Sequence, residues 1–294
     1  MGSYIAMGCQ RDVQRKRKNN RICGGNKVSH ETGIFFNVPM QVYRKASGIN
    51  QSSLKEVGIS PGHYRSKLSE PQKEPTEAMV IGTIIHSAVL ENDRSGYVVL
   101  PDDFDGRTSD GKKWRAAQTK PAIKSEVATN ISGMIASVKN HAMASRILFG
   151  EGNNEVSGWT NHKDTGLLIK GRADRLAMDA KQNTVCVDLK TTDRGGASET
   201  EFSKSIFSWG YDVQCAFYMD LFQCSYFVFV CVEKLPPYAV NCFSMDLESV
   251  AIGRRKYESY LAKIKHCEET NSWPCYGDDL KTINLPAWAM KKEI

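Results

Sequence analysis

The sequence predicts an α/β (α+β) fold in which helices flank a central mixed β-sheet. Before residue 150, apolar residues recur every three or four positions in several segments, which is typical of amphipathic helices. After residue 155, short alternating runs dominate and are then interspersed with helical runs, as expected of strands and connecting helices. Of the 294 residues 41% are hydrophobic, which is enough for a packed core.

The first 33 residues differ from the rest of the chain. They have no apolar period, and six basic residues against one Asp lie between Arg11 and Arg21. We therefore expect residues 1–33 to be a basic, disordered extension and residues 34–294 to form a single domain. The extension could hold DNA non-specifically or be merely solvated.

Three helices are predicted before the strands. Asn50 is a polar cap in front of a short helix that Pro61 breaks. Residues 77–91 have one apolar face, with His86 beside the buried stripe. Helical spacing returns over residues 131–149.

Residues 102–124 are polar and rich in Gly, Lys and Arg, so we expect a long exposed loop. Trp114 interrupts it and is flanked by Lys112, Lys113 and Arg115. This group could stack on or clamp the end of a DNA strand. A merely solvated loop is the alternative.

Three consecutive strands follow and should form a meander. The segments between them, at residues 164–166 and 179–183, have the composition of turns. A helix, two further strands and a long final helix complete the pattern. The expected ranges are 155–160, 167–178 and 184–190 for the meander, then 204–222, 225–233, 238–246 and 247–269.

The second turn of the meander places two carboxylates opposite each other. If this turn is centred on Lys181, paired residues have numbers that sum to 362, so Asp174 lies opposite Asp188. Lys190 projects from the same face because it is two residues further along the strand. Like charges at this spacing are destabilising unless a cation lies between them.

The preceding hairpin brings Glu155 close to Arg172 and adds a third carboxylate to this surface. Such oxygen ligands suit Mg²⁺, for which Mn²⁺ can substitute, and disfavour zinc. Lys190 could then orient or deprotonate an attacking water beside a phosphodiester. In most proteins, two acids and a lysine on a hairpin are ordinary surface charges. Neighbouring motifs must therefore show whether these three residues form an active site.

Four sequence motifs resemble those of one family. The GRAD run at 171–174 and the VDLKTT run at 187–192 resemble the PD-(D/E)XK signature of RecB-like nucleases. The GTIIH run at 82–86 resembles their upstream histidine motif, and residues 211–218 resemble their Gln-x-x-x-Tyr helix. The likeness is greatest to the branch typified by exonuclease VIII (RecE) and covers about residues 50–288. It implies a PD-(D/E)XK nuclease core.

The resemblance assigns metal and catalytic roles. It makes Asp174, Asp188, His86 and the backbone carbonyl of Leu189 the metal ligands, with Lys190 as the catalytic lysine. Before the resemblance is considered, a histidine beside an apolar stripe is more often structural.

Further family positions surround this centre. Glu155 matches an acidic residue of the family. Ala173 occupies the position at which the name-giving motif has Pro, and this difference removes no metal ligand. Gln214 and Tyr218 lie on one helical face that could approach the substrate, although core packing is an equal alternative for Tyr218. We also expect Ser53 and Arg172 to contact DNA.

The resemblance implies a function that residue patterns alone do not give. We expect a Mg²⁺-dependent exodeoxyribonuclease that degrades linear double-stranded DNA from its ends, 5′ to 3′, and leaves 3′ overhangs. A homo-oligomeric ring, a RecT-like single-strand annealing partner and a role in recombination are implied too. A net charge of +6 is compatible with a polyanionic partner but does not demonstrate one.

Other functions stay open. An endonuclease or a CRISPR-associated end-trimming nuclease could use the same core. A DNA-binding protein with a vestigial site is a third possibility, against which the intact acids and lysine argue. The nine scattered cysteines contain no C-x-x-C pair, so we expect no iron–sulfur cluster and a reducing, cytoplasmic location in a bacterium or phage-infected cell. No membrane association is expected.

Overall fold

The computed structural model describes residues 32–71, 75–91, 93 and 95–286. The predicted basic extension falls almost entirely on residues 1–31, which lie outside the described residues. Its last position, Gly33, begins a short strand. Within the described part, no helix combines the length and the apolar character needed to cross a membrane.

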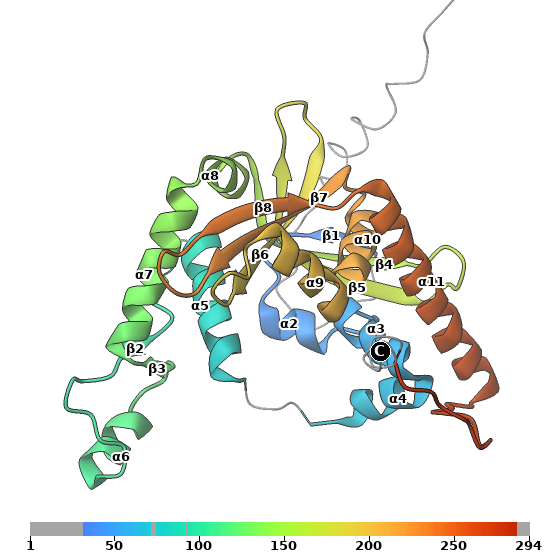
Figure 1. Cartoon of the computed structure of the whole chain (residues 1–294), viewed down its shortest axis with the longest axis horizontal. Helices are drawn as coiled ribbons and strands as arrows, with labels where there is room; N and C mark the ends of the chain where they lie inside the picture. Colours follow the sequence, from blue (N-terminus) through green and yellow to red (C-terminus); the bar gives the residue numbers. More distant parts are fainter. Residues whose placement is uncertain (1–31, 72–74, 92, 94, 287–294) are drawn as a thin grey trace, which may run out of the picture.

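A six-stranded sheet forms the centre of the molecule (Figure 1). Its order follows the sequence, and only β6 and β7 run parallel, whereas the other neighbours are antiparallel. The expected mixed sheet is therefore confirmed. Its strands are β1 (Gly33–Phe35), β4 (Gly152–Asn161), β5 (Leu168–Met178), β6 (Thr184–Thr192), β7 (Tyr226–Glu233) and β8 (Val240–Ser244).

Strands β4, β5 and β6 form the predicted meander. Arg175 pairs with Val187 and Leu176 with Cys186, so the numbers sum to 362 as expected. The ladder's last pair is Arg175 and Val187, and the next positions are those of the two aspartates. The charged face therefore begins where the backbone pairing of these strands ends.

Helices cover both faces of the sheet (Figure 1). One face packs on helices that share a large apolar core with β5, β6 and β7. The other face packs on helices that share a second core with the same strands. The first set is α3 (Gln51–Ile59), α4 (Pro61–Ser69), α9 (Glu199–Trp209), α10 (Tyr211–Phe222) and α11 (Leu247–Thr270), and the second is α5 (Glu77–Leu90), α7 (Ser125–Asn140) and α8 (Ala142–Phe149).

Two helices predicted as continuous are broken. Gly210 has a left-handed conformation, with φ 63°, and separates α9 from α10, so the single helix expected over 204–222 is wrong. His141 likewise separates α7 from α8, and its side chain accepts a hydrogen bond from the Ala144 amide at the start of α8. Apolar spacing alone does not reveal such breaks, because it continues across them.

Three helices were not predicted. Pro61 breaks α3 as expected but also opens α4, because proline fits the first position of a helix and Ser60 caps it. The expected loop over 102–124 contains α6 (Ser109–Ala116), which Thr108 caps. The short elements α2 (Met40–Lys45), β2 (Val98–Val99) and β3 (Ala122–Ile123) were also not predicted.

Candidate active site

A pocket of about 440 Å³ opens where β5 and β6 diverge. Side chains from α3, α5, β5, β6 and α10 meet there. It contains the three residues at the centre of the sequence prediction, so the predicted convergence is observed. The lining residues are Gln51, Ser52, Lys55, His86, Arg172, Asp174, Asp188, Leu189, Lys190, Thr191, Tyr211, Gln214 and Tyr218.

Asp188, Lys190 and Gln214 form a closed polar network at the pocket floor. Lys190 Nζ lies 2.6 Å from Asp188 Oδ2 and donates a hydrogen bond of 3.2 Å to Gln214 Oε1. Gln214 Nε2 donates to Asp188 Oδ1 at 2.5 Å. Since Asp188 is only 5% exposed, this network holds a buried charge in one orientation.

Asp174 is held from the neighbouring strand. Its Oδ2 accepts a hydrogen bond of 2.8 Å from the Leu189 amide, which lies beyond the last pair of the β5–β6 ladder. The pKa of Asp174 is raised to about 6, chiefly by burial, with His86 opposing the shift and the nearby Asp188 charge adding to it. A carboxylate in this position is therefore costly unless a cation compensates it.

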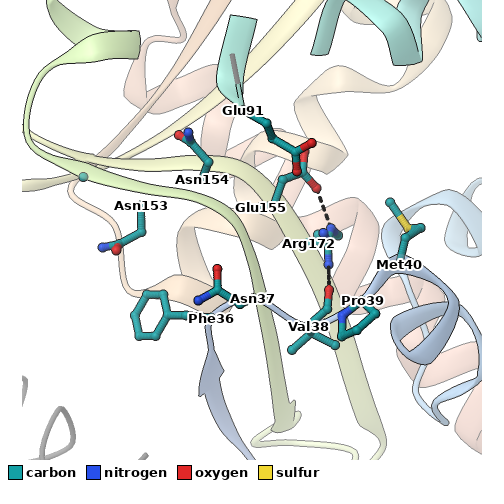
Figure 2. Close-up of a pocket in the computed structure, with 11 residues that line it drawn as sticks. Phe36, Asn37, Val38, Pro39, Met40, Glu91, Asn153, Asn154, Glu155 and Arg172 are labelled. Carbon is teal, nitrogen blue, oxygen red and sulfur yellow. Dashed lines mark hydrogen bonds and ion pairs between the residues drawn. The ribbon is translucent and has the colours of Figure 1, made fainter. Parts of the chain in front are cut away.

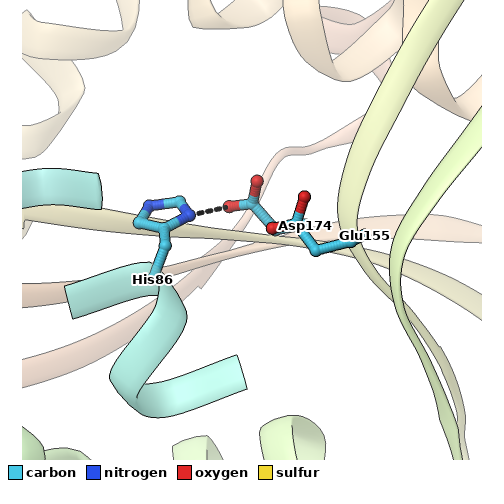
Figure 3. A group of neighbouring side chains, drawn as sticks. All are labelled: His86, Glu155 and Asp174. Atoms are coloured by element: carbon cyan, nitrogen blue, oxygen red, sulfur yellow. Dashed lines mark ion pairs between the residues drawn. The ribbon is translucent and has the colours of Figure 1, made fainter. Parts of the chain in front are cut away.

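His86 approaches the aspartate from α5 (Figure 3). Its Nδ1 lies 3.4 Å from Asp174 Oδ2, and its Nε2 donates to the Leu189 carbonyl at 2.7 Å. His86 thus contacts two groups that the family resemblance assigns as metal ligands.

Glu155 joins the same group from β4. One ligand atom each from His86, Glu155 and Asp174 lies within 4.8 Å of the others (Figure 3). Glu155 has a φ of 54° in the middle of a strand, a conformation that non-glycine residues rarely adopt. Val156 and Asn154 on either side keep the ladder with β5, so the strained residue alone leaves the pairing.

These residues fit a divalent cation. Asp188 Oδ2 is buried and, among the described residues, has no partner with hydrogen-bond geometry, although Lys190 Nζ is close. Asp188 turns toward Lys190 and Gln214 and lies outside the group formed by His86, Glu155 and Asp174. Most of the atoms that could ligate a metal here are oxygens, which suits a hard cation.

The charge of Lys190 is maintained by its surroundings. Burial lowers its pKa, but Asp188, Tyr211 and Asp174 together outweigh burial, and the net pKa is raised. Its Nζ also lies 4.5 Å from the centre of the Tyr211 ring. Lys190 is therefore an ammonium at neutral pH, which can orient water and stabilise negative charge.

Gln214 and Tyr218 both reach the pocket from α10, as the spacing predicts. Tyr218 also packs edge-on against Phe222, with ring centroids 5.8 Å apart, and lies close to Phe227. Its ring therefore belongs to both the core and the pocket wall. The two alternatives weighed for Tyr218 do not exclude each other.

Arg172 lines both this pocket and a second pocket of about 580 Å³, which is drawn in Figure 2. Its Nε donates to Glu155 Oε2 at 2.6 Å, and another guanidinium nitrogen donates to the Val38 carbonyl at 2.6 Å. The expected proximity of Glu155 and Arg172 is confirmed. Arg172 fixes Glu155, and its donors are largely engaged by the protein.

The other predicted DNA contacts lie away from the pocket lining. The Ser53 hydroxyl donates to the Asn50 carbonyl inside the helix cap. Trp114 packs edge-on against Phe104, at 5.3 Å between ring centroids, on the projecting helix α6 (Figure 1). Lys112, Lys113 and Arg115 lie on the same helix, so their contact with DNA stays a prediction.

Several lining residues were missed by sequence reasoning. Lys55 lies 5.7 Å from the centre of the Tyr211 ring, and burial followed by the nearby Lys190 charge lowers its pKa. Gln51 and Lys55 are four residues apart on α3, so they share a helical face. That spacing was visible in the sequence, but nothing indicated that this face meets β6.

A family model and one solved structure agree with this fold. Residues 50–286 match the family described as "PDDEXK-like domain of unknown function (DUF3799)". No match was found among curated proteins. Among solved structures, the chain is similar to a candidate exonuclease from Eubacterium rectale, with 13% identity and a TM-score of 0.57 over 88% of this chain and 100% of that chain.

Two further solved structures are less similar. A phage-related exonuclease from Haemophilus somnus 129PT has 12% identity and a TM-score of 0.34, covering 78% of this chain and 99% of its own. An alkaline exonuclease from Laribacter hongkongensis has 14% identity and a TM-score of 0.27, covering 64% and 95%. The family match spans most of the chain and includes every residue that lines the pocket. The resemblance carried by the GRAD and VDLKTT runs is thus confirmed, and this chain belongs to the PDDEXK-like family, whose fold is that of a nuclease.

Proposed function

We propose that this protein is a Mg²⁺-dependent exodeoxyribonuclease, with Mn²⁺ able to substitute, that degrades one strand of linear double-stranded DNA. The observation that carries the proposal is the convergence of Asp174, Asp188 and Lys190 in one pocket. His86 and Glu155 each place a ligand atom within 4.8 Å of one of Asp174. An intact set of this kind argues against a vestigial site.

The chain's own residues suggest a division of labour. Asp174, Asp188, His86 and the Leu189 carbonyl would hold the cation, which when bound polarises a phosphate oxygen and activates water. Lys190, kept protonated by its acidic neighbours, orients the water and stabilises charge that develops on the phosphate. Gln214 holds both Asp188 and Lys190 in place.

The finer parts of the proposal rest on the resemblance to the exonuclease VIII branch. They are 5′-to-3′ polarity, 3′ single-stranded overhangs, a homo-oligomeric ring around DNA, a RecT-like annealing partner in recombination, and a cytoplasmic location. The chain is similar in fold to a Eubacterium rectale protein that is described as a candidate exonuclease. That similarity is consistent with cleavage from DNA ends.

An end-labelling assay tests the proposal. Linear duplexes that carry a label at the 5′ or the 3′ terminus would be incubated with Mg²⁺ or EDTA, alongside covalently closed circles of the same sequence. We expect Mg²⁺-dependent release of the 5′ label first, uncut circles, and no release by Asp188→Ala. Cleavage of circles would favour the endonuclease alternative, and binding without cleavage in Mg²⁺ would favour the vestigial one.

A further inference from the structure

A second group of metal-ligating side chains lies at the far end of the β4–β5 hairpin. A ring nitrogen of His162 and one carboxylate oxygen each from Asp164 and Glu258 lie within 4.8 Å of one another. His162 directly follows β4, and Glu258 lies on α11, which passes beside this hairpin (Figure 1). The hairpin turn and α11 therefore converge on three donors that the nuclease site does not use.

The imidazole of His162 is buried with one nitrogen unpaired. The residue is 6% exposed, and within the described part of the chain its Nε2 has no hydrogen-bond partner. Its Nδ1 is 3.0 Å from the Thr165 hydroxyl, which also accepts a hydrogen bond from the Leu167 amide. Whichever tautomer is present, a buried lone pair or a buried N–H remains unsatisfied, which costs free energy.

Histidines that bind metals commonly have this arrangement. One ring nitrogen is held by a hydrogen bond that fixes the ring, and the other faces the ion. The backbone also fixes the turn, because the Gly166 amide donates to the His162 carbonyl and the His162 amide donates to the Leu167 carbonyl, both at 2.8 Å. The ring therefore has a defined position before any ligand binds.

The two carboxylates are close but do not pair with the histidine. Of the ion pairs within 4.0 Å among the described residues, none joins His162 to Asp164 or Glu258. Asp164 forms a long ion pair with Lys163, at 3.9 Å, and its side chain is largely exposed. The spacing is too long for direct contact, whereas an ion about 2.0 to 2.2 Å from each ligand would bridge it after a small side-chain movement.

We propose that His162, Asp164 and Glu258 form a binding site for a divalent transition metal of the Zn²⁺ type, distinct from the nuclease centre. One imidazole and two carboxylates suit such borderline ions better than Mg²⁺, which prefers oxygen ligands. The ion fastens the β4–β5 hairpin to α11, and water completes its coordination. The site does not depend on the proposed nuclease activity.

Calorimetric titration with Zn²⁺ tests the site in the full chain carrying Asp174→Asn and Asp188→Asn, which removes the principal carboxylates of the nuclease centre. We expect one Zn²⁺ per chain and a higher melting temperature with Zn²⁺ than with EDTA. Adding Glu258→Gln should weaken binding by at least about tenfold. Glu268→Gln, an exposed acid further along α11, is the matched control and should leave binding unchanged.

Two further measurements distinguish the loss of a ligand from misfolding and from binding by cysteine. Melting of the Glu258→Gln and control proteins in EDTA shows whether both fold equally, and His162→Gln gives a second way to remove a ligand. Because the chain has nine cysteines, a Co²⁺ spectrum is also needed, and we expect no thiolate-to-cobalt absorption band. No Zn²⁺ binding, binding unaffected by Glu258→Gln, or a strong thiolate band would each overturn the proposal.

Discussion

The two faces of β6 share one backbone but carry opposite kinds of side chain. Val185, Val187 and Leu189 are at most 2% exposed and belong to the apolar core beneath α5, α7 and α8. On the other face, Asp188 is nearly as buried, and Lys190 beside it pairs with its carboxylate. Burial of the first set stabilises the fold, whereas burial of the second costs stability and requires a network of partners.

The difference separates residues that hold the strand from residues that perform chemistry. Alternation along a strand allows both roles within the six consecutive positions from Val185 to Lys190. Substitutions on one face should therefore change the stability with little effect on the rate per folded molecule. Substitutions on the polar face should change the rate per folded molecule with little effect on the stability.

The largest effect is expected at Asp188. The Asp188→Asn change keeps the shape and the acceptor for Gln214 Nε2 but removes the charge that a cation requires. We expect a fall in kcat of roughly a thousandfold or more, with only a modest fall in melting temperature, because Lys190 loses its ion-pair partner while the repulsion between Asp188 and Asp174 is relieved. Single-turnover cleavage of linear duplex and thermal melting in EDTA measure the two quantities. A kcat within about tenfold of the original protein would contradict the assignment.

Leu189→Ala tests the apolar face directly. The truncated side chain is 1% exposed, so we expect a loss of about 2 to 5 kcal/mol in the free energy of unfolding. The backbone carbonyl assigned to the metal remains, so the rate per folded molecule should stay within a few-fold. Denaturant unfolding measures the loss of stability, and activity at low temperature measures the rate per folded molecule. Lost activity with unchanged stability would break the comparison between the faces.

Gln214→Leu tests whether the polar network positions the charged pair. The variant removes the donor to Asp188 and the acceptor for Lys190 while leaving both charges present. We expect a decrease in kcat of about 10- to 100-fold, smaller than at Asp188. The KM for DNA should change less than kcat. Equal effects on KM and kcat would instead place Gln214 mainly in substrate binding.

The pH dependence of stability should reflect Asp174. Its pKa rises from the ordinary value of 3.8 to about 6, so between these values the folded protein binds more protons than the unfolded chain. The contribution of Asp174 therefore becomes less favourable as the pH rises through this window in EDTA. Asp174→Asn removes this contribution. Unfolding of both proteins at about pH 4.5 and about pH 7 should show the original protein losing more stability than the variant.

The meander and its register could be predicted because they depend on local information. The turn around Lys181 fixed which residues face each other, and the alternation of Val185, Val187 and Leu189 fixed which face is apolar. The relation of Asp174, Asp188 and Lys190 follows from those two facts. The family motifs supplied the roles that we propose for His86 and Gln214.

The remaining features depend on tertiary contacts or on single backbone conformations. The left-handed Gly210 divides a helix whose apolar spacing is continuous, so the pattern does not reveal the break. Lys55 reaches the pocket because α3 packs beside α10, a contact between segments about 160 residues apart that spacing does not encode. The strained backbone of Glu155 likewise has no signature in the sequence.

The central claim is that the pocket between β5 and β6 binds a divalent cation. Anomalous scattering from crystals grown with Mn²⁺ tests this claim most directly. We predict a peak about 2.0 to 2.6 Å from the carboxylate of Asp174, with Asp188, His86 or the Leu189 carbonyl among its other ligands. The peak should disappear in Asp174→Asn. Peaks only elsewhere in the molecule, or DNA cleavage that persists with no ion bound between β5 and β6, would contradict the account.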